Sequence, residues 1–281
     1  ARSLHNQRSD LVGVIVSDLD NPFRAEQVDY LSKELLKQNL RPILLRADKD
    51  LNISEMIGAL LSYNVTGVIV TSDTPPREIC EECQNLGVPM VLINKEKTDL
   101  EIDQVQGDFL AGGKLAFDLL RDGGCKNMLV VAPEKMSYSI KGRADEFIAA
   151  CNAQNLPIHM LSIGHQDYQG GLAAANLLIE KFNQCDGIFC VADYMALGLL
   201  DGLRHTYQIS IPQDKQLVGF DNIPQSKWLS YQLSTIHQDT SALAKLTVNR
   251  LLSRLENPNQ PAQHDICSVQ AIRRATTKNP A

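Results

Sequence analysis

The chain has 281 residues, of which 44% are apolar and 5% aromatic, and its net charge is −6, from 27 basic and 33 acidic side chains. This length is enough to bury one large core or two medium ones, and the acid excess argues against this segment gripping nucleic acid by itself. No stretch approaches the roughly 18 apolar residues of a membrane span, and the N-terminal ARSLHNQRSD has no apolar signal core, so we expect a cytoplasmic protein without membrane contacts.

Apolar runs of strand length alternate along the chain with amphipathic stretches of helix length. Strands are expected at residues 12–16, 43–45, 68–70, 90–93, 128–131, 188–191 and 217–219. Continuous apolar runs are typical of parallel strands buried on both faces, and their crossovers should be right-handed. The repeated order predicts an α/β fold with doubly wound parallel sheets.

The first expected strand ends at a turn that runs straight into a helix. Asn21 and Pro22 supply the turn and a preset φ for the helix start. In open parallel sheets, ligands bind beyond the carboxyl ends of strands and against helix N-termini. The junction is therefore a candidate ligand site, although every α/β protein has strand ends of this kind.

Seven cysteines are present, and two of them, Cys80 and Cys83, form a CxxC pair inside a stretch of helical composition. No second CxxC or paired histidine follows at zinc-finger spacing, so we expect reduced cysteines, no metal and no cofactor. The chain also lacks GxSxG, Walker A, GxGxxG and HExxH motifs, and we expect no enzymatic activity.

Eight short segments carry a shared pattern over nearly the whole chain. They are VGVIVSDLDNPFR (12–24), VTGVIV (65–70), GVPMVLIN (87–94), DFLAGGKLAFDLL (108–120), RADEFIAA (143–150), DYMALG (193–198), LVGFDNIP (217–224) and LSTIHQ (233–238). In this order and spacing they resemble the effector-binding domain of lactose-repressor/galactose-repressor (LacI/GalR) transcription regulators. The resemblance implies two doubly wound lobes of the periplasmic-binding-protein-like type, joined by crossover hinges, with a small effector bound between them.

The resemblance also divides the chain discontinuously. It implies a hinge-helix remnant or linker at residues 1–9, an N-terminal lobe at 10–107 plus 240–265, a C-terminal lobe at 108–238 plus 266–275, and a frayed tail at 276–281. In the family the hinge leucine, here Leu4, enters the minor groove, but only in a full-length protein with a helix-turn-helix headpiece. We expect contact with operator DNA only through that headpiece.

Ligand contacts follow from the resemblance position by position. Arg143 matches an arginine that donates to effector oxygens, and Asp221 matches an acid that accepts from effector hydroxyls, the two facing each other across the cleft. An alternative for Asp221 is that it only caps a turn. The other candidate ligand-binding residues are Phe23, Arg24, Asp73, Asn94, Ser137, Ser139, Asp193 and Gln238.

Four positions depart from the family pattern. Arg24 stands where a second stacking aromatic is common, Gln166 is the nearest match to another aromatic, Ala192 replaces an asparagine and Glu146 replaces a glycine. A positive charge at a helix N-terminus favours an anion. We therefore expect a small polyhydroxylated effector with an anionic group, a sugar phosphate or sugar acid, unless Arg24 is only a solvent-facing helix residue.

A homodimer is also expected, formed largely through apolar helix faces of the N-terminal lobe. The run at residues 56–61 is a contributor to such a face, unless it only faces the core. The competing function is a periplasmic sugar-binding protein of the ribose-binding type, which shares the two-lobed fold. The ARSL remnant, the missing signal core and the unpaired cysteines favour the regulator.

Overall fold

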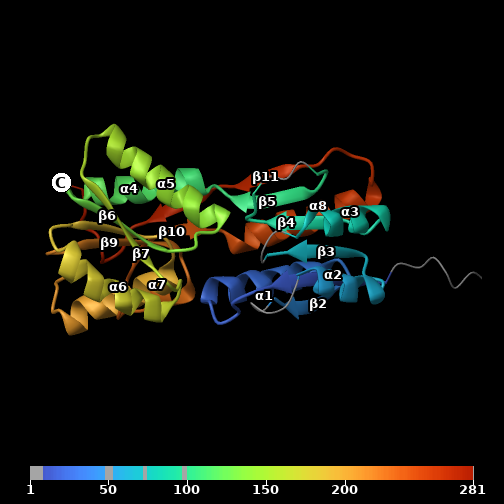
Figure 1. Cartoon of the computed structure of the whole chain (residues 1–281), viewed down its shortest axis with the longest axis horizontal. Coiled ribbons are helices and arrows are strands. Elements are labelled where there is room, and N and C mark those ends of the chain that lie inside the picture. The colour runs from blue at the N-terminus through green and yellow to red at the C-terminus, as the bar shows by residue number, and fades with distance from the viewer. Residues whose placement is uncertain (1–8, 48–52, 72–74, 97–99, 281) are drawn as a thin grey trace, which may run out of the picture. The chain divides into compact units, whose positions relative to one another are not determined.

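The structure, a computed structural model, describes residues 9–47, 53–71, 75–96 and 100–280, so the expected contacts of Leu4 and Asp73 lie outside the described residues. The chain divides into two compact units (Figure 1). The first comprises the described residues up to Asp20, Arg24–Gly107 and Asp239–Cys267, and the second comprises Asn21–Phe23, Asp108–Gln238 and the residues from Ser268 onward.

The first unit is built on a six-stranded sheet in which all neighbouring strands are parallel, in the order β11-β5-β4-β3-β1-β2. Its strands are β1 (Leu11–Val16), β2 (Arg41–Arg46), β3 (Gly67–Val70), β4 (Met90–Ile93), β5 (Asp103–Gly107) and β11 (His264–Cys267). The helices are α1 (Pro22–Lys37), α2 (Ile53–Ser62), α3 (Arg77–Asn85) and α8 (Thr240–Glu256).

Strand β1 shows why a continuous apolar run is needed here. Val14 and its alternate neighbours join a core with α1 and α8, whereas Ile15 joins a second core with α2 and α3. Since successive strand residues point to opposite faces, both faces of the strand must be apolar. Gly13 lets α2 pack directly on this strand, because a Cβ there would overlap the Leu60 side chain.

The packing of α2 corrects the expected role of the run at residues 56–61. Met56, Ile57 and Leu60 are buried in the core beneath the helix, and the exposed positions of the run are Gly58 and Ala59. Most of this run therefore faces the core, and Leu61 is half-buried against the same core.

The second unit has a sheet in the order β12-β10-β9-β8-β6-β7, parallel except for the antiparallel pair β10 and β12. Its strands are β6 (Met128–Pro133), β7 (Ile158–Ile163), β8 (Gly187–Cys190), β9 (Gln216–Asp221), β10 (Ser234–Gln238) and β12 (Val269–Ile272). The helices are α4 (Phe109–Asp122), α5 (Tyr138–Ala153), α6 (Tyr168–Lys181) and α7 (Asp193–Asp201), with a π-helical turn η1 (Gly202–Thr206) and a 3-10 turn η2 (Pro224–Lys227). The predicted doubly wound α/β class is confirmed, whereas the antiparallel edge strand was not predicted.

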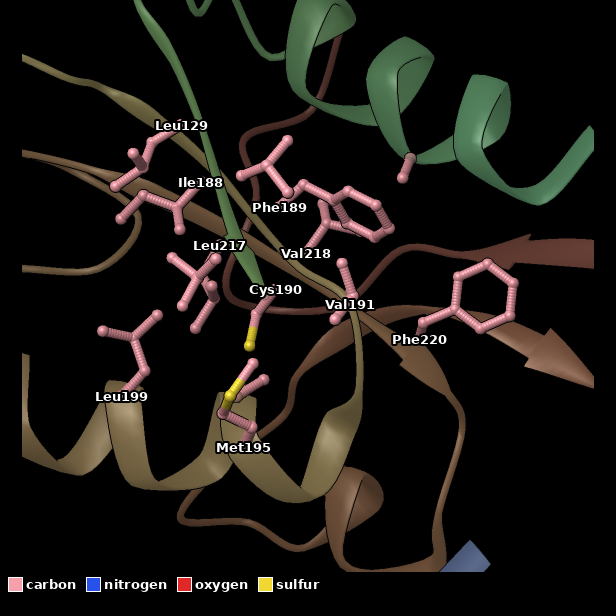
Figure 2. Close-up of a cluster of buried hydrophobic side chains, with 14 of the residues drawn as sticks. Leu129, Ile188, Phe189, Cys190, Val191, Met195, Leu199, Leu217, Val218 and Phe220 are labelled. Atoms are coloured by element: carbon pink, nitrogen blue, oxygen red, sulfur yellow. The ribbon is translucent and has the colours of Figure 1, made fainter. Parts of the chain in front are cut away.

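Helices α4 and α5 cover one face of this second sheet and α6 and α7 cover the other (Figure 1). Figure 2 shows Met195 and Leu199 pointing from α7 toward the sheet residues Cys190 and Leu217. On the α5 side, the rings of Phe147 and Phe189 stack with centroids 4.9 Å apart. The sheet is therefore packed on both faces.

At two places where the chain passes from one unit to the other, an aspartate caps the N-terminus of the next helix. Asp108 and Asp239 are the N-cap residues of α4 and α8, and their carboxylates accept hydrogen bonds from Ala111 N and Ala242 N, each at 2.9 Å. An aspartate N-cap satisfies one free helical N–H and favours the helix dipole. Each of these crossings therefore leads directly into a new helix.

The expected frayed tail at residues 276–281 is wrong for its first residues. Thr276 is fully buried, and its hydroxyl donates to the Leu217 carbonyl at 2.7 Å and accepts from Ser234 N at 2.8 Å. Thr277 is buried as well, with its hydroxyl 2.7 Å from that of Ser234. The first residues of this segment instead bond to β9 and to β10.

No helix in the described part of the chain is long and apolar enough to cross a membrane.

The close packing of α6 on α7 makes a stability prediction. A Cβ at Gly171 would overlap the Met195 carbonyl oxygen, whereas nothing lies within 4 Å of a Cβ at the exposed Gly58 of α2. We expect Gly171→Ala to lower the free energy of unfolding by about 3 kcal/mol or more through overpacking. Gly58→Ala, the matched control, should raise it by roughly 0.5–1 kcal/mol. Urea unfolding of both variants checks this, and equal effects would contradict the helix packing described.

Candidate functional site

Polar side chains gather at the carboxyl edge of the second sheet, where β8, β9 and β10 end. Arg143, from α5, donates from Nη1 to the Val191 carbonyl at 2.7 Å and to Asp221 Oδ1 at 3.3 Å. Its guanidinium carbon lies 3.8 Å from the centroid of the Phe220 ring. Gln238, the last residue of β10, donates from Nε2 to the same Asp221 oxygen at 2.7 Å. These contacts form a buried polar cluster of one cation, one carboxylate and one amide.

The position of this pair differs from the expectation that Arg143 and Asp221 face each other across a cleft. Both belong to the second unit, and they contact each other directly, with side chains only 4% and 6% exposed. The physical reason is topological: α5 follows β6 and Asp221 ends β9, and parallel strands of one sheet end at the same edge. In this structure the donor and the acceptor are each other's partners.

The backbone at the end of β9 is strained. Asp221 has φ of 115° and Asn222 has φ of 59°, both in the left-handed region that non-glycine residues rarely adopt. Each such residue costs on the order of 1–3 kcal/mol, and such strain clusters at ligand sites. The strain thus coincides with the carboxylate that the resemblance assigns to ligand binding.

Asp193, the first residue of α7, is fully buried beside this turn. Its carboxylate accepts from the Thr235 hydroxyl at 2.7 Å and from Ile223 N at 3.1 Å. Burial, followed by the neighbouring Asp221 carboxylate, raises the pKa of Asp193 well above its usual range. Both of its oxygens therefore have partners inside the protein.

Helix α5 brings a further predicted residue to the same place. Ser139 is buried one turn before Arg143 and shares its helix face, because residues four apart lie on one side of a helix. Ser137, just before the helix, is exposed, and the two serine hydroxyls lie 3.4 Å apart. The structure thus brings together Arg143, Asp221 and Gln238, and Ser139 lies on the same helix face as Arg143.

The remaining predicted residues lie near the carboxyl ends of β1 and β4. Arg24 is half-buried, donates from Nη1 to the Thr71 carbonyl at 3.2 Å and has Nε 3.8 Å from an Asp18 oxygen. Asn94 has φ of 57°, and its Oδ1 accepts from Gly107 N at 3.0 Å. Arg24 is therefore not a freely solvated helix residue.

Phe23 is half-buried in the first turn of α1, and Asn21 Oδ1 accepts from its N–H at 3.0 Å. Sequence reasoning missed Asp18, which compensates part of the charge of Arg24, although it lies inside the first matching segment. It also missed His237 and Arg274, which contact Asn222 from β10 and from the chain after β12. Nothing in the local sequence of Arg274 marks it, because its partner lies 52 residues away.

The CxxC pair forms no reactive site among the described residues. All seven cysteines are buried and free, and no group of three or more His, Cys, Asp or Glu side chains in the described part of the chain is placed to hold a metal ion. Burial raises the pKa of Cys80 to about 11 and that of Cys83 to about 12. Thiols with such pKa values are weak nucleophiles at neutral pH.

Several known proteins are similar to this chain in sequence and fold. Residues 117–277 match the periplasmic-binding-protein-like domain family. The chain is 29% identical to the HTH-type transcriptional repressor PurR of Actinobacillus pleuropneumoniae, over 91% of this chain and 77% of that one. It is 26% identical to the ribose operon repressor of Haemophilus influenzae, over 92% and 79% of the two chains. A LacI family transcriptional regulator from Enterococcus faecium, solved with bound ribose, superposes with a TM-score of 0.88 at 27% identity, covering 96% and 99%.

The family match covers more than half of the chain. The chain therefore belongs to the periplasmic-binding-protein-like domain family. Its relatives are transcriptional repressors rather than enzymes. These relatives and the similar LacI family structure support an effector-sensing core of a LacI-type transcription regulator over a periplasmic transport protein. The resemblance found in the sequence is therefore confirmed.

The buried thiols make a prediction about reactivity. Since a raised pKa leaves less of the reactive thiolate, an aromatic disulfide reagent should modify the folded protein at about pH 8 at least roughly a hundredfold more slowly than a free cysteine. In guanidinium all seven thiols of the chain should react at the normal rate. Absorbance of the released thiol measures both rates. Rapid modification of Cys80 or Cys83 in the folded protein, located by mass spectrometry, would contradict this result.

Proposed function

We propose that the cluster of Arg143, Asp221 and Gln238 binds the hydroxyl groups of a small polyhydroxylated effector and so controls a cytoplasmic repressor. The observation that supports this proposal best is the pairing of a pure donor with a pure acceptor at the edge of a packed sheet. A sugar hydroxyl both donates and accepts, so it satisfies a guanidinium and a carboxylate together. We further propose that specific DNA binding needs a helix-turn-helix segment, as in the HTH-type repressors that this chain resembles.

Ribose is the first ligand to test, since a similar regulator was solved with it. Asp221→Asn removes the charge but keeps the shape, and we expect it to weaken sugar binding by about 1.5–3 kcal/mol, the scale of a charge-assisted hydrogen bond. The matched control is Asp145→Asn on the exposed face of α5, which loses only an ion pair with Lys141. Isothermal titration with ribose, ribose 5-phosphate, a sugar acid and a nucleoside measures the affinities. Equal loss in both variants, or none in Asp221→Asn, would contradict the proposed site.

We also propose that Arg24 binds the anionic group of the effector. Arg24→Ala should weaken binding of a sugar phosphate or sugar acid by roughly 1.5–3 kcal/mol and leave the neutral sugar unchanged. Asp18→Asn gives the opposite control, because it removes the carboxylate 3.8 Å from Arg24 and leaves more net positive charge for the anion. The same titrations decide the matter: tight binding of the neutral sugar, or unchanged anion affinity in Arg24→Ala, rules the anion selectivity out.

A symmetric homodimer is the proposed assembly. Because most of the run at residues 56–61 faces the core, we propose a different surface from the one expected on the N-terminal lobe. In the second unit, Leu229 is 94% exposed beside the 57% exposed Trp228. We expect Leu229→Asp to weaken the dimer by at least about tenfold, since it places a charge in an apolar contact. Met160→Asp, on the edge strand β7, serves as control. Sedimentation at micromolar concentration is the measurement, and a monomeric unmodified chain would refute the assembly.

A further inference from the structure

Two successive residues in the left-handed region need an external support. Asp221 and Asn222, with φ of 115° and 59°, form the turn that leaves β9, and neither is glycine. Strained residues persist only where the surroundings over-determine their conformation. The contacts of this turn therefore show what fixes the direction of the Asp221 carboxylate.

One support comes from the N-terminus of α7. The Asp193 carboxylate accepts from Ile223 N, the first amide after the two strained residues, and from the Thr235 hydroxyl on β10. It lies against β9 at Gly219, where a Cβ would overlap the carboxylate. Asp193 thus ties α7, the turn and β10 together, and none of its surface is left exposed for a ligand.

The second support comes from the segment that follows β12. Arg274 donates from Nη2 to Asn222 Oδ1 at 2.6 Å and from Nη1 to the Leu233 carbonyl at 2.6 Å. The side-chain nitrogen of Asn222 lies 3.1 Å from His237 Nδ1 on β10. Asn222 is therefore held at both ends of its amide, and the turn is fixed from two sides.

We propose that Asp193 and Arg274 are positioning residues, which hold the turn at residues 221–223 in its strained conformation and so aim Asp221 at the effector. Asp193 acts through Ile223 and Thr235 and does not itself touch the ligand. This inference rests on the proposed effector site, because the aim of Asp221 matters only if Asp221 binds.

The substitutions at residue 193 separate positioning from direct contact. Asp193→Ala removes the acceptor for Ile223 N and the partner of the Thr235 hydroxyl. Asp193→Asn keeps an acceptor for the amide, and its NH₂ group can donate to the Thr235 oxygen. If the ligand contacted the Asp193 charge directly, both variants would lose sugar affinity. If only the hydrogen bonds of Asp193 matter, the asparagine variant keeps the sugar affinity of the unmodified chain.

The experiment uses the whole 281-residue chain, with amide hydrogen exchange at Ile223 and titration with ribose and ribose 5-phosphate as two readouts. For Asp193→Ala we expect exchange at Ile223 at least about tenfold faster and sugar affinity at least about tenfold lower, and for Asp193→Asn values within about threefold of the unmodified chain. Asp186→Ala is the matched control, since Asp186 accepts from Lys126 N and Asn127 N at the opposite edge of the same sheet. It should lower stability without changing either readout at the site.

The outcomes are distinct. Unchanged exchange at Ile223 in Asp193→Ala overturns the inference, and so does equal loss of affinity in the alanine and asparagine variants. If the unmodified chain binds none of the sugars, the proposed function fails, and the exchange at Ile223 alone still decides whether Asp193 holds the turn. If Asp193→Ala does not fold, Thr235→Val replaces it, with a smaller change in the same direction expected and no change overturning the inference.

Discussion

The contact between the Arg143 guanidinium and the Asp221 carboxylate is the interaction on which the account of this chain depends. Both groups are almost fully withdrawn from water, and removing water from two charges is expensive unless each finds good partners. Val191, Phe220 and Gln238 supply those partners. An effector hydroxyl at this edge would meet charges that are already desolvated and oriented, so little reorganisation would oppose binding.

The frame around this contact is a sheet packed on both faces. The apolar runs of β6, β8 and β9 place their side chains alternately toward the two helical layers, which fixes the strand ends relative to one another. The polar residues then follow at the carboxyl edge, the place where doubly wound sheets bind ligands. Chain connectivity adds a link, because Gln238 contacts Asp221 and is followed directly by Asp239, the N-cap of α8 in the first unit.

Much of this architecture could be predicted from the sequence, for a physical reason. Strands buried on both faces need continuous apolar runs, so β1, β3, β4, β6, β8 and β9 stand out in the sequence. Strand β5, DQVQG, and the edge strand β7, IHMLSI, were not predicted, because polar residues interrupt their apolar pattern. The antiparallel β12 was missed for the related reason that nothing local encodes the direction of a strand pair.

The candidate site was predictable only in part. Arg143, Asp221 and Gln238 sit in recognisable segments, but their direct pairing depends on residues up to 78 positions apart. Nothing in the local sequence of Arg274 or His237 predicts their contacts with Asn222. The sequence around Thr276 likewise does not predict its hydrogen bond to the Leu217 carbonyl. The run at residues 56–61 was ambiguous, since an apolar stripe on a helix looks the same whether it meets a sheet or a partner.

The measurement that tests the central claim most directly is a crystal structure of the chain with whichever sugar binds most tightly. The account predicts ligand hydroxyl oxygens within hydrogen-bond distance of both the Arg143 guanidinium and the Asp221 carboxylate, with residues 221 and 222 still at positive φ. A ligand bound elsewhere on the chain, with neither Arg143 nor Asp221 in contact with it, would contradict it.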